Sequence, residues 1–271
     1  MIPLIDGDIL CYEIAFAAEL GWRSITQEED ALPPFTYVHT LLETRIAQLC
    51  SEVSATSSPI IYLTGEDNFR EQIAIRKGYK ANRDKEKRPF HYQNIRTYLI
   101  GVMGATVTEG MEADDMLGVH QVQALKKGQL TIICTRDKDL RMIPGWHYSW
   151  ELGRQPSWGP CYVVDPGYLI YQNKKFYGTG LAWFFAQCLT GDIVDNIPGI
   201  PGVGPVKAYK ILKDSYDKED MFNRVYEQYV CHYGDNAEEE LMEQGQLLWM
   251  TRELDEDNKP ILWRFRDEDY I

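Results

Sequence analysis

The amino-acid sequence predicts an α/β fold with a mainly parallel sheet, followed by a helical extension. Short apolar runs rich in β-branched residues recur at residues 2–5, 59–63, 105–107 and 130–134. Between them lie helical patterns, with apolar residues three and four positions apart, at about 35–50, 90–103 and 113–125. Strands that alternate with helices are typical of parallel sheets, because a parallel crossover needs a connection of about a dozen residues or more.

After about residue 177 the strand patterns stop and helical segments dominate, as in GLAWFFAQCLTG and MFNRVYEQYVCHY. We therefore expect an α/β core over residues 1–176 and a helical extension over residues 177–271. The core includes a basic segment at about 70–96. The chain of 271 residues is long enough to bury a sizeable core, and the alternative is that both parts form one continuous domain.

The charge of the chain is unevenly distributed. The net charge of −13 would by itself argue against a nucleic-acid partner. However, residues 70–96 contain nine basic and three acidic side chains, whereas residues 235–271 contain twelve acidic and four basic ones. A nucleic-acid partner is therefore compatible with the basic segment.

Cysteine usage and hydropathy indicate a reducing compartment and no membrane partner. Six cysteines are scattered without a CxxC pair, which argues against a zinc ribbon or a disulfide framework. No apolar run approaches the roughly 20 residues of a membrane span, and the N-terminus MIPLIDGDIL has no basic stretch typical of a signal peptide. We expect a cytoplasmic monomer.

Carboxylates follow each of the four predicted strands. They are Asp6 after the first strand, Glu66 and Asp67 after the second, Glu112, Asp114 and Asp115 after the third, and Asp137 and Asp139 after the fourth. The carboxyl ends of parallel strands share one edge of a sheet, so we expect these side chains to converge. Asp192 and Asp195 form a further pair, three residues apart.

Each of these acids alone has an ordinary explanation as a helix N-cap or as a solvated first helical turn. Together they would repel one another strongly unless they were protonated or bridged by cations. Mg²⁺ or Mn²⁺ is the simplest solution, because both ions prefer oxygen ligands. Two such ions, about 3.5–4 Å apart, are the usual apparatus for phosphodiester hydrolysis.

Five motifs occur in an order that resembles the flap endonuclease and 5′-nuclease family. They are IDGD, YKANR, GMEADDM, TRDKDL and GDIVDNIPGIPGVGPVKA. This family includes the 5′-nuclease domains of bacterial DNA polymerase I and phage 5′–3′ exonucleases. IDGD, YKANR and the closing EQGQLLWMTRE…ILWRF are particularly similar to the T7-type phage enzymes. The resemblance runs from about residue 2 to 265 and implies a PIN-like sheet and a metal-dependent nuclease. It also favours a phage origin, which the sequence does not decide; a phage-encoded protein would be found in the host cytoplasm.

The resemblance also implies which acids bind metal. Glu112, Asp114, Asp115 and Asp137 would belong to the first metal region, Asp139, Asp192 and Asp195 to the second, and Asp6 would stand near both. At the end of the second strand many relatives have an Asp, whereas this chain has Leu63-Thr64-Gly65. Glu66 or Asp67 is a candidate substitute. Asp8 is expected one pleat beyond Asp6, in a secondary role.

The basic segment supplies the positive charge that an acidic site lacks. Lys80 and Arg83 match the basic pair of the family's active site and would act there together with Asp6. Further candidates for DNA binding are Arg76 and Lys77, expected one turn away, Lys85, Lys87 and Arg88 beyond, and Tyr79, which would stack on bases. The alternative for this segment is a solvated helix face of mixed charge.

The stretch at about 189–212 resembles a helix-hairpin-helix of the type called H3TH. Gly202 and Gly204 are expected to form a tight turn, and Lys207 to begin the next helix. Glycines allow the backbone to approach a phosphate, and N–H groups at a helix start can bind it. The family implies a K⁺ ion held by carbonyls of this turn. The alternative is an ordinary Gly-Pro loop between two helices.

These features favour a metal-dependent 5′-nuclease that hydrolyses DNA phosphodiesters from 5′ ends or at flap junctions, and the sequence leaves open which of the two. One rival is a phosphatase of the haloacid-dehalogenase type with Asp6 as nucleophile, but that mechanism needs few further carboxylates. A second rival is a non-catalytic, structure-specific DNA-binding protein, which the presence of nearly all core acids disfavours.

Overall fold

The computed structural model describes residues 1–82 and 88–265, and these residues form two compact units. The first unit contains residues 1–66, 88–137 and 145–161, and the second contains 67–82, 138–144 and 162–265. This division differs from the single boundary after residue 176 that the sequence predicts, because two short internal segments belong to the second unit. Each unit is therefore described by itself.

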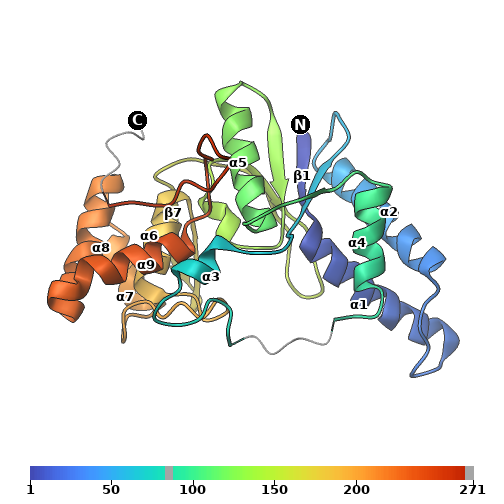
Figure 1. Ribbon diagram of the computed structural model, residues 1–271, viewed down its shortest axis with the longest axis horizontal. Helices are drawn as coiled ribbons and strands as arrows, with labels where there is room; N and C mark the ends of the chain where they lie inside the picture. Colours follow the sequence, from blue (N-terminus) through green and yellow to red (C-terminus); the bar gives the residue numbers. More distant parts are fainter. Residues whose placement is uncertain (83–87, 266–271) are drawn as a thin grey trace. The chain divides into compact units, whose positions relative to one another are not determined.

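A six-stranded sheet of order β3-β2-β1-β4-β5-β6 forms the centre of the first unit (Figure 1). The strands are β1 Ile2–Asp6, β2 Ile60–Leu63, β3 Thr106–Val107, β4 Thr131–Cys134, β5 Gly145–Ser149 and β6 Trp158–Val163. Pairing is parallel from β3 through β5. The four predicted strands are confirmed, and β5 and β6 lie outside the prediction.

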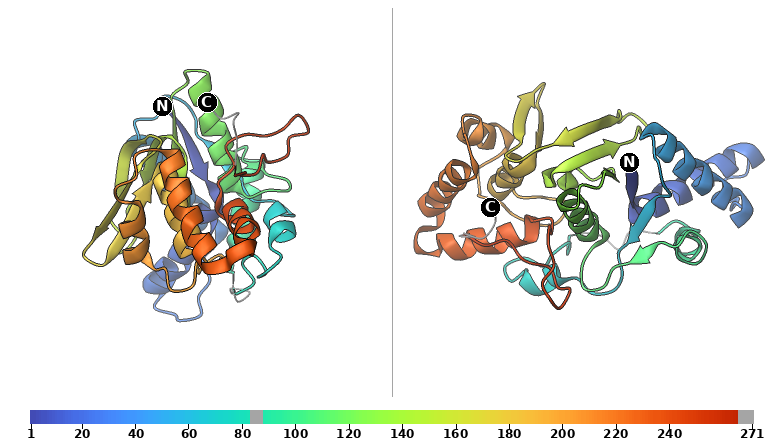
Figure 2. Two further views of the ribbon diagram at one scale, coloured as in Figure 1. Left: turned by 90° about the vertical axis from the view of Figure 1, so that its left-hand side faces the viewer. Right: turned by 90° about the horizontal axis from the view of Figure 1, so that it is seen from above.

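Helices cover both faces of this sheet, as the view from above in Figure 2 shows. One face packs against α1 (Gly7–Thr26), α2 (Phe35–Glu52) and α4 (Tyr92–Gly101), with Ile5, Ile61 and Ile132 of the sheet in the shared core. The other face is covered by α5 (Ala113–Lys126), which contacts β1, β2 and β4. Burial on both faces explains why the central strands read as continuous apolar runs.

Helix α1 lies outside the predicted elements, although Leu10, Ile14 and Ala18 recur at helical spacing and are buried. Asp6 ends β1 and caps α1, since its side chain accepts a hydrogen bond from the N–H of Ile9. The expected place of Asp8, one pleat beyond Asp6, is therefore wrong. Asp8 lies in the first turn of α1, where a carboxylate suits the positive end of the helix dipole.

In the second unit, helices surround α6 (Gly180–Thr190), which is almost entirely buried. The other elements are α3 Phe69–Ile73, the short 3₁₀ helices η1 Asp139–Met142 and η2 Gly234–Asn236, the hairpin β7 Tyr168–Gln172 and β8 Lys175–Thr179, and the helices α7 Pro205–Leu212, α8 Lys218–Tyr233 and α9 Ala237–Leu248. Helices α6 and α8 confirm two predicted segments. No helix in the described part of the chain is long and apolar enough to cross a membrane.

Helix α9 organises the second unit by binding the backbone of two distant segments. The Glu243 carboxylate accepts hydrogen bonds from the N–H groups of Ile75 and Arg76, at 3.0 and 2.9 Å. The Gln244 amide oxygen accepts one from the N–H of Gly199, at 2.7 Å. Both side chains belong to the closing EQGQLLWMTRE motif. That motif therefore positions the basic segment and the loop before α7.

The end of α9 is capped by a buried arginine. Arg70, which is fully buried in α3, donates hydrogen bonds to the carbonyls of Leu247 and Trp249, at 3.0 and 2.8 Å. A guanidinium satisfies the unpaired carbonyls at a helix C-terminus and also complements the negative end of the dipole. Helices α3 and α9 are thereby tied together.

The loop between α6 and α7 closes through two crowded glycines. Gly191 and Gly199 have φ values of +69° and +64°, which favour glycine. A Cβ at Gly199 would lie 2.3 Å from the backbone N of Gly191. The loop turns back on itself here, because Asp192 pairs with Ile197 in an isolated β-bridge.

We expect Gly199→Ala to lower the free energy of unfolding by about 2–5 kcal/mol. The alanine side chain would be strained by the left-handed backbone and would also clash with the backbone of Gly191. Gly202→Ala is the matched control. Gly202 has φ +78° but open space around its Cβ position, so only about 1–2 kcal/mol should be lost. Chemical denaturation of both variants measures the difference; equal losses would show that the Gly191–Gly199 contact is not tight.

Candidate active site

The predicted metal ligands are distributed over both units. Asp6, Glu112, Asp114, Asp115 and Asp137 belong to the first unit, and Asp139, Asp192 and Asp195 belong to the second. Each set lies at the ends of the elements expected from the sequence, namely after β1, before α5, after β4 and in the loop after α6.

Asp6 is the most deeply perturbed acid of the first unit. Its side chain is 3% exposed, and its two oxygens accept hydrogen bonds from the Ile9 N–H at 3.1 Å and the Thr135 hydroxyl at 2.8 Å. Burial, together with the charges of Asp8 and Asp137, raises the pKa of Asp6 to about 7, although both hydrogen bonds oppose the shift. An additional positive charge is needed to keep this carboxylate ionised at low cost.

Thr135 connects Asp6 to the acid that follows β4. Its hydroxyl oxygen also accepts a hydrogen bond from the N–H of Asp137, at 3.0 Å. Thr135 is itself buried, so this linkage fixes the backbone at the end of β4. The hydroxyl is a neutral partner and cannot offset the charges of the two carboxylates.

The acids before α5 are partly engaged in starting that helix. Asp115 is fully buried, and its carboxylate accepts a hydrogen bond from the N–H of Glu112 at 3.2 Å, which is half of a capping box. Glu112 and Asp114 are half-buried. The Thr64 hydroxyl at the end of β2 accepts a hydrogen bond from the Ala113 N–H at 2.9 Å, which holds the start of α5 against the sheet.

Asp8 supplies the carboxylate at the end of β2, which the sequence analysis did not anticipate. It accepts hydrogen bonds from the Thr64 N–H at 2.9 Å and from the Arg96 guanidinium at 2.8 Å. Arg96 also donates to the carbonyl of Thr64, at 2.7 Å. Glu66 and Asp67, the candidate substitutes, are exposed.

In the second unit, an ammonium group lies between two of the predicted metal ligands. The Nζ of Lys138 is 2.9 Å from Asp192 and 3.4 Å from Asp139. Burial would raise the pKa of Asp192, but the Lys138 ammonium and the Val194 N–H outweigh burial and hold that pKa below its ordinary value. Lys138 is part of the TRDKDL motif, but no role for it was predicted.

The backbone of the basic segment is attached to the loop that carries Asp195. The N–H of Lys80 donates to the carbonyl of Asp195 at 3.0 Å, and the Asn82 amide donates to the carbonyl of Ile193 at 2.6 Å. In the opposite direction, the Asn196 amide donates to the carbonyl of Gly78 at 2.9 Å. These contacts fix residues 78–82 beside the acid pair.

This attachment places Lys80 next to a predicted metal ligand. Its Nζ is 4.0 Å from Asp195, and its φ of +54° is unusual for a residue other than glycine. Such backbone strain, which costs about 1–3 kcal/mol, persists only where the surroundings enforce it. The side chain also lies over the ring of Tyr79, with 4.8 Å between Nζ and the ring centroid.

Several predictions for the basic segment are wrong. Tyr79 is buried and its hydroxyl donates to Asp195 at 3.1 Å, so it is not available for base stacking. Arg76 is not free to bind DNA, because its guanidinium pairs with Glu240 and Glu243 of α9. The segment after α3 is also not helical, so Arg76 and Lys77 do not lie one helical turn from Lys80.

The remaining basic candidates are exposed or fall outside the described residues. Lys77 is exposed, and the exposed guanidinium of Arg88 lies 5.0 Å from the ring centroid of Tyr92. Arg83, Lys85 and Lys87 lie outside the described residues.

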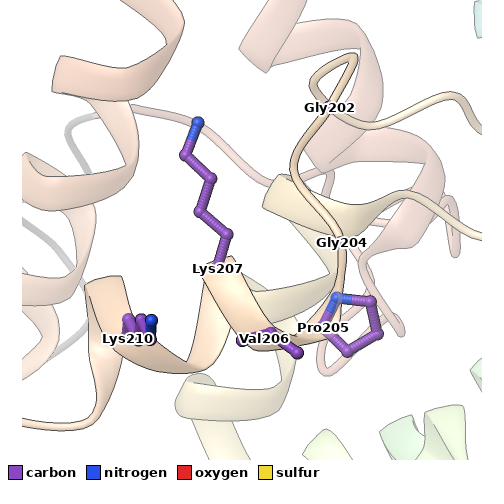
Figure 3. A pocket seen from close by; sticks show the side chains of 6 residues that line it. All are labelled: Gly202, Gly204, Pro205, Val206, Lys207 and Lys210. Carbon is purple, nitrogen blue, oxygen red and sulfur yellow. The ribbon is translucent and has the colours of Figure 1, made fainter.

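The predicted hairpin is present between α6 and α7, as Figure 3 shows. Gly202 is left-handed, whereas Gly204 is extended with open space around its Cβ position and serves as the N-cap of α7. Lys207 is the third residue of α7 rather than its first. A side chain at Gly204 would therefore not crowd the turn; it would only occupy space in front of the helix start.

In the described part of the chain, no three acidic, imidazole or thiol groups converge into a ready metal cluster. The carboxylates of Asp6, Asp115 and Asp192 accept hydrogen bonds from N–H groups, from the Thr135 hydroxyl or from Lys138. Their chemistry nevertheless fits a hard divalent cation. All the candidate ligands are carboxylates, which bind hard cations through oxygen. The pKa of Asp6 is raised, and the Lys138 ammonium lies between Asp139 and Asp192.

Residues 1–145, just over half of the chain, match the family described as "5′-3′ exonuclease, N-terminal resolvase-like domain". The chain belongs to this 5′-3′ exonuclease family. It is also 31% identical over 231 residues to DNA polymerase I of Chloroflexus aurantiacus and 27% identical over 228 residues to that of Mycobacterium leprae. Each match includes 83% of this chain but only 23% and 24% of the polymerases, so the chain spans about a quarter of their length.

Solved structures confirm the fold. The bacteriophage T5 D15 flap endonuclease, in a complex with DNA and metal ions, aligns with a TM-score of 0.63 at 16% identity, covering 91% of this chain and 88% of that one. The catalytic core of Rad2 with a DNA substrate aligns with a TM-score of 0.50 at 15% identity, covering 97% and 82%. At these identities the alignments establish the fold alone: a mostly parallel, PIN-like sheet with a helical C-terminal region.

We expect Lys138→Met to lower the melting temperature in EDTA and to tighten binding of Mg²⁺ or Mn²⁺. Without the ammonium group, Asp139 and Asp192 lose an ion-pair partner. An added metal ion then no longer competes with Lys138 for these two carboxylates. A half-exposed ion pair of about 1 kcal/mol corresponds to roughly a fivefold tighter apparent Kd. Thermal denaturation against metal concentration measures both effects.

Lys213→Met is the matched control, because Lys213 pairs at 3.5 Å with the neighbouring Asp214 on the surface of the same unit. It should leave the metal dependence unchanged. A metal response of Lys138→Met equal to that of the wild type would contradict the competition.

Proposed function

We propose that the chain is a metal-dependent 5′-nuclease, which hydrolyses DNA phosphodiester bonds from 5′ ends or at flap junctions. Membership of the 5′-3′ exonuclease family supports this proposal. So do the structurally similar proteins, two of which were solved with DNA and one with divalent zinc.

The observation that carries the proposal is the position of Lys138 between Asp139 and Asp192. A positive group at this place reduces the repulsion between the two carboxylates. A divalent cation would do the same with twice the charge. Asp6 adds a second indication, because burial raises its pKa to about 7 and a cation beside this carboxylate would favour its ionised form. Mg²⁺ or Mn²⁺ is the proposed cofactor, because both are hard ions.

The proposed ligands are the acids that the family resemblance implies, grouped here by the unit in which each lies. Asp6, Glu112, Asp114, Asp115 and Asp137 would hold one ion, and Asp139, Asp192 and Asp195 a second. Bound ions of this kind lower the pKa of an attacking water and stabilise charge on the attacking and leaving oxygens. Within the chain, Thr135 and Gln187 orient the carboxylates of Asp6 and Asp139 through hydrogen bonds of 2.8 and 2.7 Å.

Lys80 is the proposed partner of the reacting phosphate. Negative charge develops on the phosphate oxygens during hydrolysis, and a fixed ammonium nearby stabilises that charge. Because Lys80 is fixed by the Asp195 carbonyl and by its left-handed backbone, little reorganisation is needed when DNA binds. Arg83 would act with it.

Helix α7 and the turn before it are the proposed grip on duplex backbone. The left-handed Gly202 and the N-cap Gly204 leave the start of α7 open to a phosphate, with Lys207 and Lys210 beside it (Figure 3). The K⁺ ion at this turn and the monomeric state remain predictions. The reducing compartment, expected from the spacing of the cysteines, also remains a prediction.

The two rival functions are less well supported. A phosphatase of the haloacid-dehalogenase type needs Asp6 as an accessible nucleophile, yet both Asp6 oxygens are engaged and buried. A non-catalytic DNA-binding protein would have no need of buried, mutually repelling carboxylates.

We expect Asp137→Asn and Asp192→Asn each to lower the cleavage rate by at least about a hundredfold, while affinity for a flapped duplex changes less than about threefold. Single-turnover cleavage in Mg²⁺ and binding in EDTA separate the two effects. Asp214→Asn, an exposed surface change, is the control and should cleave like the wild type. Full activity of both site variants would refute the assignment, and activity only on small phosphoesters would favour the phosphatase.

A further inference from the structure

The hairpin β7–β8 carries a second basic surface directly beside the proposed duplex grip. Its turn contains Lys174 and its second strand begins with Lys175, and both side chains are exposed. The ring of Tyr171 in β7 lies 6.3 Å from that of Tyr209 in α7, measured between centroids. The hairpin therefore packs against the helix that follows the H3TH-type turn (Figure 1).

The hairpin has an inner face that fixes it and an outer face that is free for a ligand. Tyr171 and Phe176 form an inner cross-strand pair, and the Phe176 ring lies 5.5 Å from Trp183 of the buried helix α6. On the outer face, Gln172 pairs with Lys175. Lys174 and Lys175 are thus presented at the tip of an element held on its other side by α6 and α7.

The charge of this surface is opposite to that of the chain as a whole. Residues 166–191 and 196–213 contain no Asp or Glu, although the chain carries a net charge of −13. The exposed lysines on the hairpin and α7 that have no ion-pair partner among the described residues are Lys174, Lys175, Lys207 and Lys210. Four exposed lysines on two segments without acids, in so acidic a chain, fit a polyanion such as duplex nucleic acid.

The backbone of the turn gives an independent indication. Asn173 and Lys174 link the two strands and have φ values of +52° and +61°, as a two-residue type I′ turn requires. Glycine is strongly preferred at the second of these positions, because a side chain there strains the left-handed backbone. Glycine would give a more stable turn at position 174, so the lysine there indicates a function other than stability.

We propose that Lys174 and Lys175 bind the phosphate backbone of the same DNA duplex that the α7 region grips, and so extend the contact beyond the H3TH-type motif. This inference rests on the proposed function for its ligand. The hairpin adds sequence-independent affinity, because lysines contact phosphates as point charges. It takes no part in cleavage itself.

The test uses the whole protein and a fluorescent 30-base-pair duplex with a 5′ flap, in EDTA so that no cleavage occurs. We expect Lys174→Gly to weaken binding about fivefold at 0.1 M salt and to flatten the slope of log affinity against log salt by about one unit. Lys175→Gln should act similarly, and the double variant should lose about two units. At the same time Lys174→Gly should raise the melting temperature, because glycine adopts the left-handed conformation at this position without strain.

Lys259→Gln is the control, because Lys259 is an exposed lysine of the same unit that lies among Asp255, Glu256 and Asp257. It should bind the duplex like the wild type. If the hairpin variants bind like this control while Lys207→Gln binds more weakly, the inference is wrong but the proposed function stands. If the wild type does not bind the duplex at all, both are wrong.

Discussion

The structure depends on keeping carboxylates charged in places where charge is expensive. Asp6 and Asp115 are almost completely buried, and Asp192 nearly so. Neutral N–H and hydroxyl groups satisfy their hydrogen bonds, but hydrogen bonds from neutral groups offset only part of the cost of a buried charge. Lys138 places a positive group between Asp139 and Asp192. A bound cation would lower the cost of the charge on Asp6, whose pKa burial raises to about 7.

The segments of the second unit that carry Lys80 and Asp195 are fixed by backbone contacts rather than by their own secondary structure. Residues 78–82 and the loop around Asp195 bind each other, and α9 binds both the segment at 75–76 and Gly199. These irregular segments can therefore carry acids and lysines in strained conformations. The same helix explains the closing motif, whose polar residues have structural rather than catalytic roles.

The sequence was sufficient for the four strands β1 to β4 and for the carboxylates that follow them, because β-branched runs and the acids after them are local patterns. It was insufficient where distant segments decide the outcome. From the sequence, Tyr79 was expected to be an exposed aromatic residue in a basic segment, but it is buried and donates a hydrogen bond to Asp195. Arg76 forms ion pairs with glutamates of α9 that lie more than 160 residues away in the sequence. The predicted position of Asp8 was wrong because helix α1 starts directly after β1. The role of Lys138 could not be predicted, because it depends on the position of the loop that carries Asp192.

The most direct test of the account is to follow the polarity and metal dependence of cleavage on one substrate. A flapped duplex labelled at the 5′ end, and the same duplex labelled at the 3′ end, would be incubated with the protein in Mg²⁺ and in EDTA. The account predicts short 5′-labelled products in Mg²⁺, a shortened 3′-labelled strand that retains its label, and no products in EDTA. Cleavage that persists in EDTA, or that begins at the 3′ end, would contradict it.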